Sequence, residues 1–420
     1  MVNPRPPGLR FPVARTAAPL PRNPGPTRCT GQNRRHPSVR NRRGLAVAAA
    51  VLSSALVLAG CARDTGTPAA GGDAAATECA RNPAPAAAGG AAPTAAPIAP
   101  NADASALRVG LAFDVGGRGD QSFNDSAYAG LEQAVAELGL VQANTREVAA
   151  ATGESEDARV SRLRQLATDG FSPIVAVGFA YSESLTTVAA EFPDTQFAIV
   201  DSVVDLPNVT SLTFAAEQGS FLVGAAAALR TTSCQIGFVG GVEVPLIQAF
   251  EAGYVQGAKA VAPDIQVDVD YISPAGDFSG FNDPARGTEV TRGQLDGGAD
   301  VVYHAAGGSG QGVFEAVASA TTADAPKYAI GVDSDQYNTV AAPTNEVIMT
   351  SMLKRVDVAV FNYINAVAGG DTTVIPPVFD LSVDGVGYST TGGGVDDIAA
   401  DLDAYKAAII SGDITVSSTP

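Results

Sequence analysis

The chain has 420 residues, 46% of them hydrophobic, which is enough for a sizeable core and for two domains. Ten of its 26 basic residues lie within residues 1–60, a stretch without Asp or Glu. The remainder of the chain therefore has 16 basic and 44 acidic residues. Such an acidic surface repels phosphate backbones and anionic lipid, which argues against a role in binding nucleic acid.

The first 60 residues have the pattern of an export signal. Three arginines within residues 40–43 precede the apolar run GLAVAAAVLSSALVLAGC, which is shorter than the roughly 20 residues that a membrane span needs. Its ending at residues 58–61, LAGC, resembles the bacterial lipobox, which implies a diacylglyceryl thioether on Cys61. Residues 1–60 are therefore interpreted as a signal peptide, with residues 1–38 upstream of the true start. A plain signal peptide or an N-terminal anchor helix are the alternatives.

Residues 61–104 consist largely of Ala, Pro, Gly and Thr and are predicted to be a disordered, lipid-anchored linker. With Cys29 upstream of the start and Cys61 as the anchor, Cys79 and Cys234 remain as an even pair in an oxidising compartment. They are candidates for a disulfide, although their spacing does not decide the geometry. The two histidines and four cysteines offer no cluster with zinc spacing, so no metal site is expected.

From Leu107 onward, predicted strands alternate with predicted helices, and the pattern restarts near residue 233. Short apolar runs that end in glycine or polar residues predict buried parallel strands, and the segments between them have helical spacing. The predicted strands lie at 107–113, 145–150, 172–180, 195–201, 234–242, 265–273, 299–306 and 327–335. The predicted helices lie at 126–139, 156–170, 183–193, 245–263, 283–298 and 308–321.

This pattern predicts an α/β fold of the periplasmic-binding-protein type. Two doubly wound parallel-sheet lobes would be joined by a hinge, with a ligand cleft between them. The N-terminal lobe is assigned residues 105–232 plus about 350–420, and the C-terminal lobe residues 233–349. Open α/β sheets bind ligands beyond the carboxyl ends of their strands, so the candidate residues are sought there.

The first strand end is followed by Asp114, Phe123 and Asn124, within the stretch GLAFDVGGRGDQSFNDSAYAGL. Two rings from different lobes could sandwich a flat ligand, and Phe281 is the second ring, with Phe278 as the alternative. An asparagine amide both donates and accepts hydrogen bonds, which suits the edge of a purine. Taken singly, each ring could equally be a helix staple or a cover for a domain edge.

The remaining strand ends supply Gly307, in the run GGSGQG, together with Asp333 and Lys354. Glycines let the backbone approach a ligand, and a carboxylate beside an ammonium can bracket two neighbouring hydroxyls. Because the set holds one basic residue, it is not suited to a phosphate. The expected ligand is planar, polyhydroxylated and uncharged. Alone, the glycine run could be a tight turn, Asp333 a turn cap and Lys354 a solvated charge.

Five stretches in this order resemble the basic membrane protein family of substrate-binding lipoproteins of ABC transporters, which includes purine nucleoside receptors. They are DVGGRGDQSFNDSAYAGL, FVGGVEVPLIQAFEAGYVQGA, FNDPARG, GVDSDQ and SMLKRVD, and they span nearly all of residues 107–370. The resemblance implies a nucleoside between Phe123 and Phe281, with Asn124 and Asp114 at the base. Asp333, Lys354 and the Gly307 backbone would contact the ribose.

The expectation is thus a monomeric receptor on the outer face of the cell membrane, anchored by lipidated Cys61, that delivers a nucleoside to an ABC permease and its ATPase. It would touch the membrane only through its lipid, and neither a cofactor nor catalysis is expected. The alternatives are a receptor for another small polar ligand, such as a sugar or a signalling molecule, and a nucleoside hydrolase. The hydrolase would need a metal or a general acid, for which Asp114 and Asp120 are the candidates.

Overall fold

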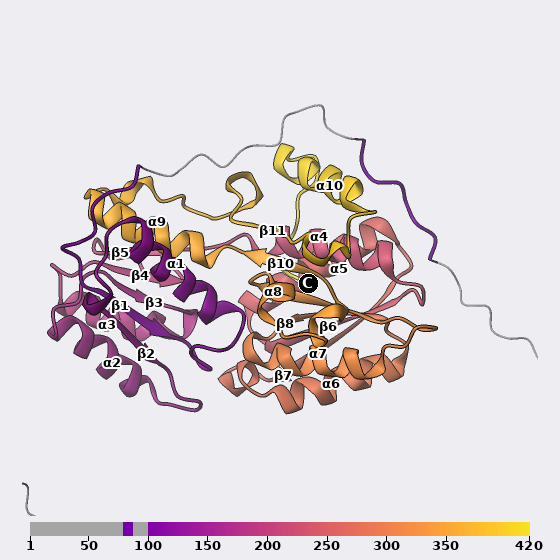
Figure 1. Cartoon of the computed structure of the whole chain (residues 1–420), viewed down its shortest axis with the longest axis horizontal. Coiled ribbons are helices and arrows are strands. Elements are labelled where there is room, and N and C mark those ends of the chain that lie inside the picture. Colours follow the sequence, from indigo (N-terminus) through magenta and orange to yellow (C-terminus); the bar gives the residue numbers. More distant parts are fainter. Residues whose placement is uncertain (1–78, 87–99) are drawn as a thin grey trace, which may run out of the picture. The chain divides into compact units, whose positions relative to one another are not determined.

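The computed structural model describes residues 79–86 and 100–420, and it contains two α/β sheets (Figure 1). The predicted signal peptide and Cys61 lie outside the described residues. Five parallel strands form the first sheet in the order β2-β1-β3-β4-β5. They are β1 (Val109–Phe113), β2 (Thr145–Ala149), β3 (Ile174–Ala176), β4 (Phe197–Val200) and β5 (Val209–Leu212).

The second sheet has the order β11-β10-β9-β8-β6-β7, and the antiparallel strand β11 lies at its edge. Its strands are β6 (Gln235–Val242), β7 (Gln266–Ser273), β8 (Val301–Ala305), β9 (Tyr328–Asp333), β10 (Ile348–Lys354) and β11 (Val386–Tyr388). If the strands of each sheet are numbered in chain order, both sheets contain the order 2-1-3-4-5, which is a doubly wound order. In such sheets ligands bind beyond the carboxyl ends of the strands. The predicted fold class is confirmed.

Successive side chains of a strand in the first sheet point to opposite faces, and both faces of the sheet are covered by helices. Val109, Leu111 and Phe113 of β1 pack with α1 (Phe123–Glu137) and α9 (Val356–Gly369). Ala112 faces the other way, toward α2 (Glu156–Thr168) and α3 (Ser182–Glu191). A strand with helices on both sides is apolar throughout, which is why the local sequence identified it.

The second sheet is covered in the same way. One face packs against α4 (Ala216–Arg230), α5 (Pro245–Val261) and α10 (Ala399–Ser411). The other packs against α6 (Pro284–Gly297) and α7 (Gly310–Ala320). A short helix, α8 (Gln336–Thr339), follows β9. We call β1–β5 with α1–α3 and α9 the first lobe, and β6–β11 with α4–α8 and α10 the second lobe.

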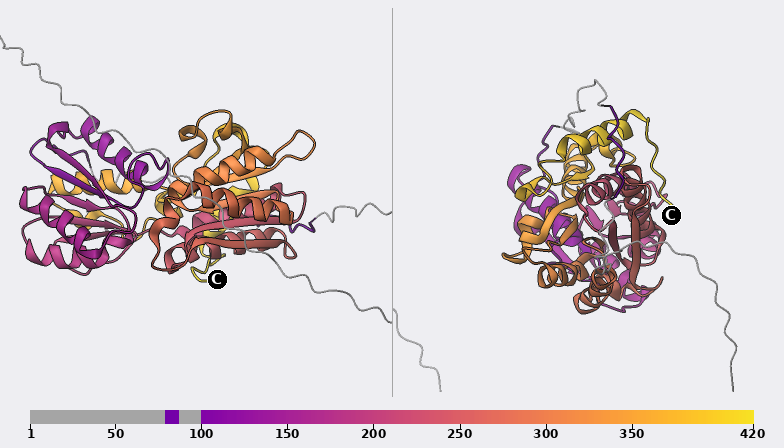
Figure 2. Two further views of the ribbon diagram at one scale, coloured as in Figure 1. Left: turned by 90° about the horizontal axis from the view of Figure 1, so that it is seen from below. Right: turned by 90° about the vertical axis from the view of Figure 1, so that its right-hand side faces the viewer.

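The division between the lobes differs from the predicted one. Residues 216–230 form α4, which packs on α5 of the second lobe, and β10 and β11 pair in the second sheet. The C-terminal helix α10 also packs on the second lobe, so mainly α9 of the segment 350–420 returns to the first lobe. Figure 2 shows α9 in orange among the indigo and magenta elements of the first lobe. Local periodicity identifies a helix or a strand but not the sheet on which it packs.

The chain crosses between the lobes near residues 214, 355 and 380. Two of these crossings run side by side, because the Phe379 N–H donates to the Thr213 carbonyl at 2.8 Å and the Ala215 N–H to the Phe379 carbonyl at 3.1 Å. The rings of Phe214 and Phe379 stack with centroids 5.2 Å apart. This paired connection forms the hinge between the lobes.

Parts of the predicted linker are docked rather than disordered. Cys79 forms a disulfide with Cys234, and the Arg81 guanidinium donates to the carbonyls of Ala228 and Thr231 at the end of α4. Further on, Ala104 is fully buried against the first lobe. A prediction of disorder from composition therefore fails for segments that are held by a disulfide and by hydrogen bonds to a helix end.

Helices α4 and α5 cross at glycine contacts. A Cβ atom on Gly257 would lie 1.9 Å from the Phe221 carbonyl oxygen, and one on Gly253 would lie 2.1 Å from the Glu217 carbonyl oxygen. These distances leave no room for a methyl group, so the helix backbones can approach only because both positions are glycine.

We therefore expect Gly257→Ala to lower the free energy of unfolding by about 1–3 kcal/mol, because overpacking outweighs the gain in helix propensity. Gly293→Ala in α6 is the matched control. Nothing lies within 4 Å of its added methyl group, so a gain of up to about 1 kcal/mol is expected. Urea unfolding measures both, and equal stabilisation of the two variants would contradict the close crossing.

Candidate functional site

A cavity opens where the carboxyl ends of the strands of both sheets meet. Its empty volume is about 550 Å³, counted with the solvent at its mouth. All seven positions that the sequence singled out for ligand binding line this cavity. They are Asp114, Phe123, Asn124, Phe281, Gly307, Asp333 and Lys354.

The loop between β1 and α1 fixes the Asn124 amide. Asn124 Oδ1 accepts the Asp114 backbone N–H at 3.0 Å, and Nδ2 donates to Asp120 Oδ2 at 3.0 Å. The protein thus already uses one lone pair of the amide oxygen and one of the two amide hydrogens. Asn124 keeps one further N–H and one further lone pair for other partners.

Asp120, considered above as an acid for a hydrolase, holds the start of α1. Its carboxylate accepts the backbone N–H groups of Ser122, Asn124 and Asp125 at 2.8–3.1 Å. These groups belong to the first turn, where N–H groups lack helical partners and the helix dipole favours a negative charge. Asp120 therefore has a structural role in placing Phe123 and Asn124.

Asp114 is 7% exposed, and one of its carboxylate oxygens, Oδ1, accepts the Val115 N–H at 2.7 Å. Burial raises the pKa of its carboxyl to about 6, while the Val115 N–H and the Arg159 guanidinium act to lower it. The other oxygen lies against Gly178, whose φ is 112° and whose added Cβ would come within 2.3 Å of it. Glycine at 178 is therefore required for this carboxylate to fit.

Rings from both lobes line the cavity. Phe123 comes from the start of α1 in the first lobe, and Phe281 comes from the loop after β7 in the second lobe. Phe278, the alternative ring, does not line the cavity but packs edge-on against Phe179, with centroids 5.5 Å apart. Phe179 does line it, and the sequence reasoning had not singled it out.

The cavity also holds a buried ammonium, Lys354 Nζ, which lies 4.6 Å from the centroid of the Phe123 ring. Lys354 is 2% exposed and forms a hydrogen-bonded ion pair with Asp201, and its Nζ lies 3.9 Å from Asp333 Oδ1. Asp201 directly follows β4 in the first lobe, and Asp333 is the last residue of β9 in the second lobe. Each therefore lies at the carboxyl end of the fourth strand of its sheet, counted in chain order. Both residues have φ values near +60°, a strained conformation that is concentrated at functional sites.

Asp201 was missed by the sequence reasoning, which treated it only as the end of a strand. The signal was present, because the apolar run FAIV is followed directly by this carboxylate at the sheet edge that binds ligands. Leu246, Ile247 and Phe250 of α5 were missed as well. They form an apolar wall that the sequence presents only as the ordinary face of a helix.

Asp333 also connects the two lobes. Its Oδ2 accepts the Ser122 hydroxyl at 2.7 Å, next to Phe123 in the first lobe. Burial raises the pKa of Asp333, while the Lys354 charge and the Ser122 hydroxyl act to lower it. Gly307 has a φ of 53° and lies against the backbone of Phe281, so its own backbone faces the cavity without a side chain.

Comparison with known proteins places this cavity in a family context. Residues 107–414 match the family of PnrA-like ABC transporter substrate-binding proteins. The chain belongs to this family. The resemblance noted in the sequence is thereby confirmed, and the protein is an ABC transporter substrate-binding protein of the extracytoplasmic solute-binding class.

Two relatives and one solved structure indicate the extent of the similarity. A CD4+ T-cell-stimulating antigen of Listeria monocytogenes is 34% identical, over 74% of this chain and 88% of that protein. The ABC transporter nucleoside-binding protein BmpA of Lactococcus lactis is 33% identical, over 74% and 89%. The crystal structure of an ABC transporter solute-binding protein from Aeropyrum pernix has a TM-score of 0.62 and 27% identity, covering 74% of this chain and 93% of that one.

Three further features bear on what this binding protein can do. Within residues 79–86 and 100–420, no three His, Cys, Asp or Glu side chains are grouped so that they could hold a metal ion. His304, the histidine that a catalytic triad would need, is fully buried, and its Nε2 is hydrogen-bonded to Gln336 Oε1 at 3.0 Å. In the same described part of the chain, no helix is long and apolar enough to cross a membrane.

The buried Asp114 makes a prediction about stability. Because its pKa is raised in the folded state, folding favours the protonated form, and stability is lost as the pH rises from about 4 to about 6. We expect Asp114→Asn to raise the free energy of unfolding by up to about 3 kcal/mol above pH 7, and by about half as much at pH 5. Urea unfolding across pH 5–8 tests this, and a destabilised variant would show that the carboxylate is favourably bound instead.

Proposed function

We propose that this protein is a nucleoside receptor that is anchored by lipidated Cys61 and delivers its ligand to an ABC permease and its ATPase. The observation that carries the proposal is that rings from both lobes line one cavity together with several polar groups. Phe123 and Phe281 would hold the base, since stacking on aromatic rings contributes roughly 1–3 kcal/mol per base. No catalytic role is assigned to any of these residues.

The charge of the cavity supports an uncharged ligand. Four carboxylates line it, from Asp114, Asp120, Asp201 and Asp333, against the single ammonium of Lys354. A phosphate would meet a net negative lining and no group free to neutralise it, so nucleotides are disfavoured. Lys354 between Asp201 and Asp333 instead offers a donor flanked by acceptors, which suits the two adjacent hydroxyls of a ribose.

The descriptions of related proteins support the proposal. BmpA of Lactococcus lactis is described as a nucleoside-binding protein, and relatives in Pyrococcus horikoshii and Pyrococcus furiosus as lipoproteins. The lipobox-like ending at Cys61 is consistent with the second description.

Calorimetric titration of the purified protein with adenosine, inosine, guanosine, uridine and ribose tests the proposal. We expect saturable binding of purine nucleosides and none of ribose, because ribose lacks the base that the rings would hold. Phe123→Ala and Phe281→Ala should each weaken binding by about 10- to 100-fold. Phe192→Leu is the control, since Phe192 directly follows α3, packs partly buried against the core and does not line the cavity. Binding of ribose or another sugar with no nucleoside binding would replace the nucleoside by a sugar.

The hydrogen-bond inventory makes a sharper prediction. Asn124 has one N–H left to donate, and ionised Asp114 can only accept, so we expect the ligand edge to offer an acceptor next to an N–H group. The bases of adenosine and inosine both meet this requirement. Purine riboside has no N–H group on its six-membered ring, so it should bind at least about tenfold more weakly than both. Equal affinities in the same titration would show that the two side chains do not contact the base.

A further inference from the structure

A second set of contacts joins the lobes outside the cavity, where the loop between β1 and α1 meets the second lobe. The carbonyl oxygen of Gln121 accepts hydrogen bonds from Gln336 Nε2 and from the Thr339 hydroxyl, each at 3.1 Å. The next carbonyl, that of Ser122, accepts the Ser334 hydroxyl at 2.9 Å. None of these residues lines the cavity. We call the three donors of the second lobe, Ser334, Gln336 and Thr339, the clasp.

The acceptor side of this contact has two unusual features. Gln121 has a φ of 56°, a left-handed conformation that is strained for a residue other than glycine. Ser122 directly precedes α1, where a serine normally accepts a backbone N–H of the first turn, but its hydroxyl makes no such bond. The hydroxyl instead faces the second lobe, with Asp333 Oδ2 at 2.7 Å and the Val332 carbonyl at 3.1 Å, and Asp120 takes over the capping. This turn is therefore shaped for contact with the second lobe.

Gln336 is fully buried, and the second lobe fixes which way its amide points. Its Oε1 lies 2.8 Å from the Val332 N–H, which can only donate, so this atom is the amide oxygen and the NH₂ group faces Gln121. His304 Nε2 lies 3.0 Å from the same oxygen and must therefore donate to it. The backbone N–H of Gln336 donates to the Ser351 hydroxyl at 3.0 Å. The donor that reaches the first lobe is thus held on several sides.

This arrangement gives the buried His304 a task. Because Nε2 carries the hydrogen, Nδ1 carries a lone pair, which has no hydrogen-bond partner among the described residues. Burial lowers the pKa of the ring to about 4, so the ring is neutral at neutral pH. A Cβ atom on Gly310 would lie 2.0 Å from the imidazole Cε1, so the ring fits only beside a glycine. The ring offers one donor, and this donor holds the Gln336 oxygen.

The carbonyls that the clasp holds lie directly before two residues of the cavity. Phe123 and Asn124 follow Ser122 in the chain and begin α1. A constraint on the carbonyls of Gln121 and Ser122 is therefore a constraint on the start of the helix that carries both side chains. The clasp belongs to the second lobe, so this constraint exists only while the lobes are in contact.

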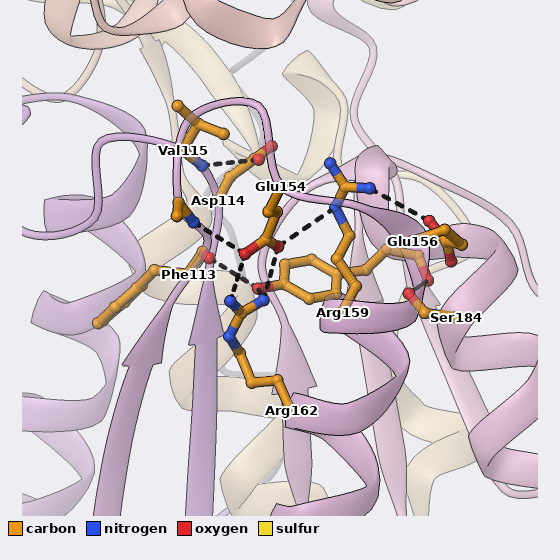
Figure 3. Close-up of polar contacts among 10 residues, drawn as sticks. Phe113, Asp114, Val115, Glu154, Glu156, Arg159, Arg162 and Ser184 are labelled. Atoms are coloured by element: carbon orange, nitrogen blue, oxygen red, sulfur yellow. Dashed lines mark hydrogen bonds and ion pairs between the residues drawn. The ribbon is translucent and has the colours of Figure 1, made fainter.

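The buried polar network in Figure 3 differs from the clasp because it lies within one lobe. Arg162 of α2 donates to Glu154 Oε1 at 2.7 Å and to the Tyr181 hydroxyl at 3.1 Å. That hydroxyl donates at 2.9 Å to the carbonyl of Phe113, the last residue of β1. This network supports the same loop from the side of the first lobe, and it does not depend on contact between the lobes. It therefore offers a matched control.

We propose that the clasp holds the two lobes closed and couples this closure to the placement of Phe123, with His304 as the residue that positions Gln336. The effect on affinity rests on the proposed nucleoside-binding function, whereas the effect on the lobes does not. A ligand enters while the clasp is open and is retained when the clasp forms, so the clasp slows ligand release. Because the clasp does not touch the ligand, it acts equally on every nucleoside that the cavity accepts.

The first test is the double variant Ser334→Ala/Thr339→Val, which removes two clasp hydroxyls. Thr339 is exposed and Ser334 partly exposed, so the variant should fold normally, which a urea unfolding curve checks. Adenosine should dissociate about 5- to 50-fold faster, and the factor should be the same for inosine and guanosine. Thr186→Val and Ser319→Ala are the controls, because these hydroxyls donate to carbonyls of their own helices. Unequal factors for the three nucleosides, or unchanged release, would overturn the proposal.

His304 is tested by two substitutions that differ in one donor. The amide nitrogen of glutamine is as many bonds from Cβ as Nε2 of histidine, so His304→Gln can still donate to Gln336 Oε1, whereas His304→Leu cannot. His304→Leu should release adenosine about tenfold faster than the wild type, and His304→Gln should remain within about threefold of it. Equal effects of the two substitutions would show that His304 only fills space. If His304→Leu does not fold, the double variant at the surface still decides the proposal.

A measurement without ligand separates this inference from the proposed function. In small-angle X-ray scattering, the Ser334→Ala/Thr339→Val variant should have a larger radius of gyration than the wild type, because its lobes separate more often. Tyr181→Phe removes a hydrogen bond inside the first lobe and should leave the radius unchanged. If adenosine does not bind the wild type, the proposed function fails, and this comparison still decides the inference. Equal radii for the wild type and the double variant would overturn it.

Discussion

One buried ammonium contacts both lobes at the cavity. Lys354 is the last residue of β10 in the second sheet, directly before the chain crosses to α9 in the first lobe. A buried cation needs partners, and it finds Asp201 from the first lobe and Asp333 from the second. The same group therefore contacts carboxylates of both lobes and lines the cavity, where it can donate hydrogen bonds.

The repetition of one topology in two sheets explains why the carboxylates are available in pairs. Asp201 and Asp333 occupy the same place in their lobes, at the end of the fourth strand, and share a left-handed backbone conformation. Each sheet thus delivers a carboxylate to the same edge, and the single lysine lies between them. A fold with two like lobes produces a cavity with related polar groups on both walls, into which α5 adds an apolar side.

Much of this organisation could be predicted from the sequence, because strand ends in an α/β sheet are marked locally. The run VGLAF followed by Asp114, or AIGV followed by Asp333, shows where a buried strand meets the ligand edge. Asp201 also directly follows a buried strand but was overlooked. Gly178 and the apolar face of α5 could not be identified in this way, because a glycine after a strand and an apolar helix face are common features. The assignment of β10, β11 and α10 to the second lobe depends on pairing between distant segments, which local periodicity does not contain. The docking of residues 79–86 depends likewise on a disulfide partner 155 residues away.

The polar groups around Asn124 show why residue type alone does not define recognition. Asparagine in isolation offers donors and acceptors, yet Asn124 gives one lone pair of its oxygen to the Asp114 N–H and one amide hydrogen to Asp120. One oxygen of the Asp114 carboxylate in turn accepts the Val115 N–H. What the cavity presents is the set of hydrogen-bonding groups left over after the protein has satisfied its own. Around Asn124 this remainder includes one amide N–H beside the Asp114 carboxylate, which favours a ligand edge with an acceptor next to a donor.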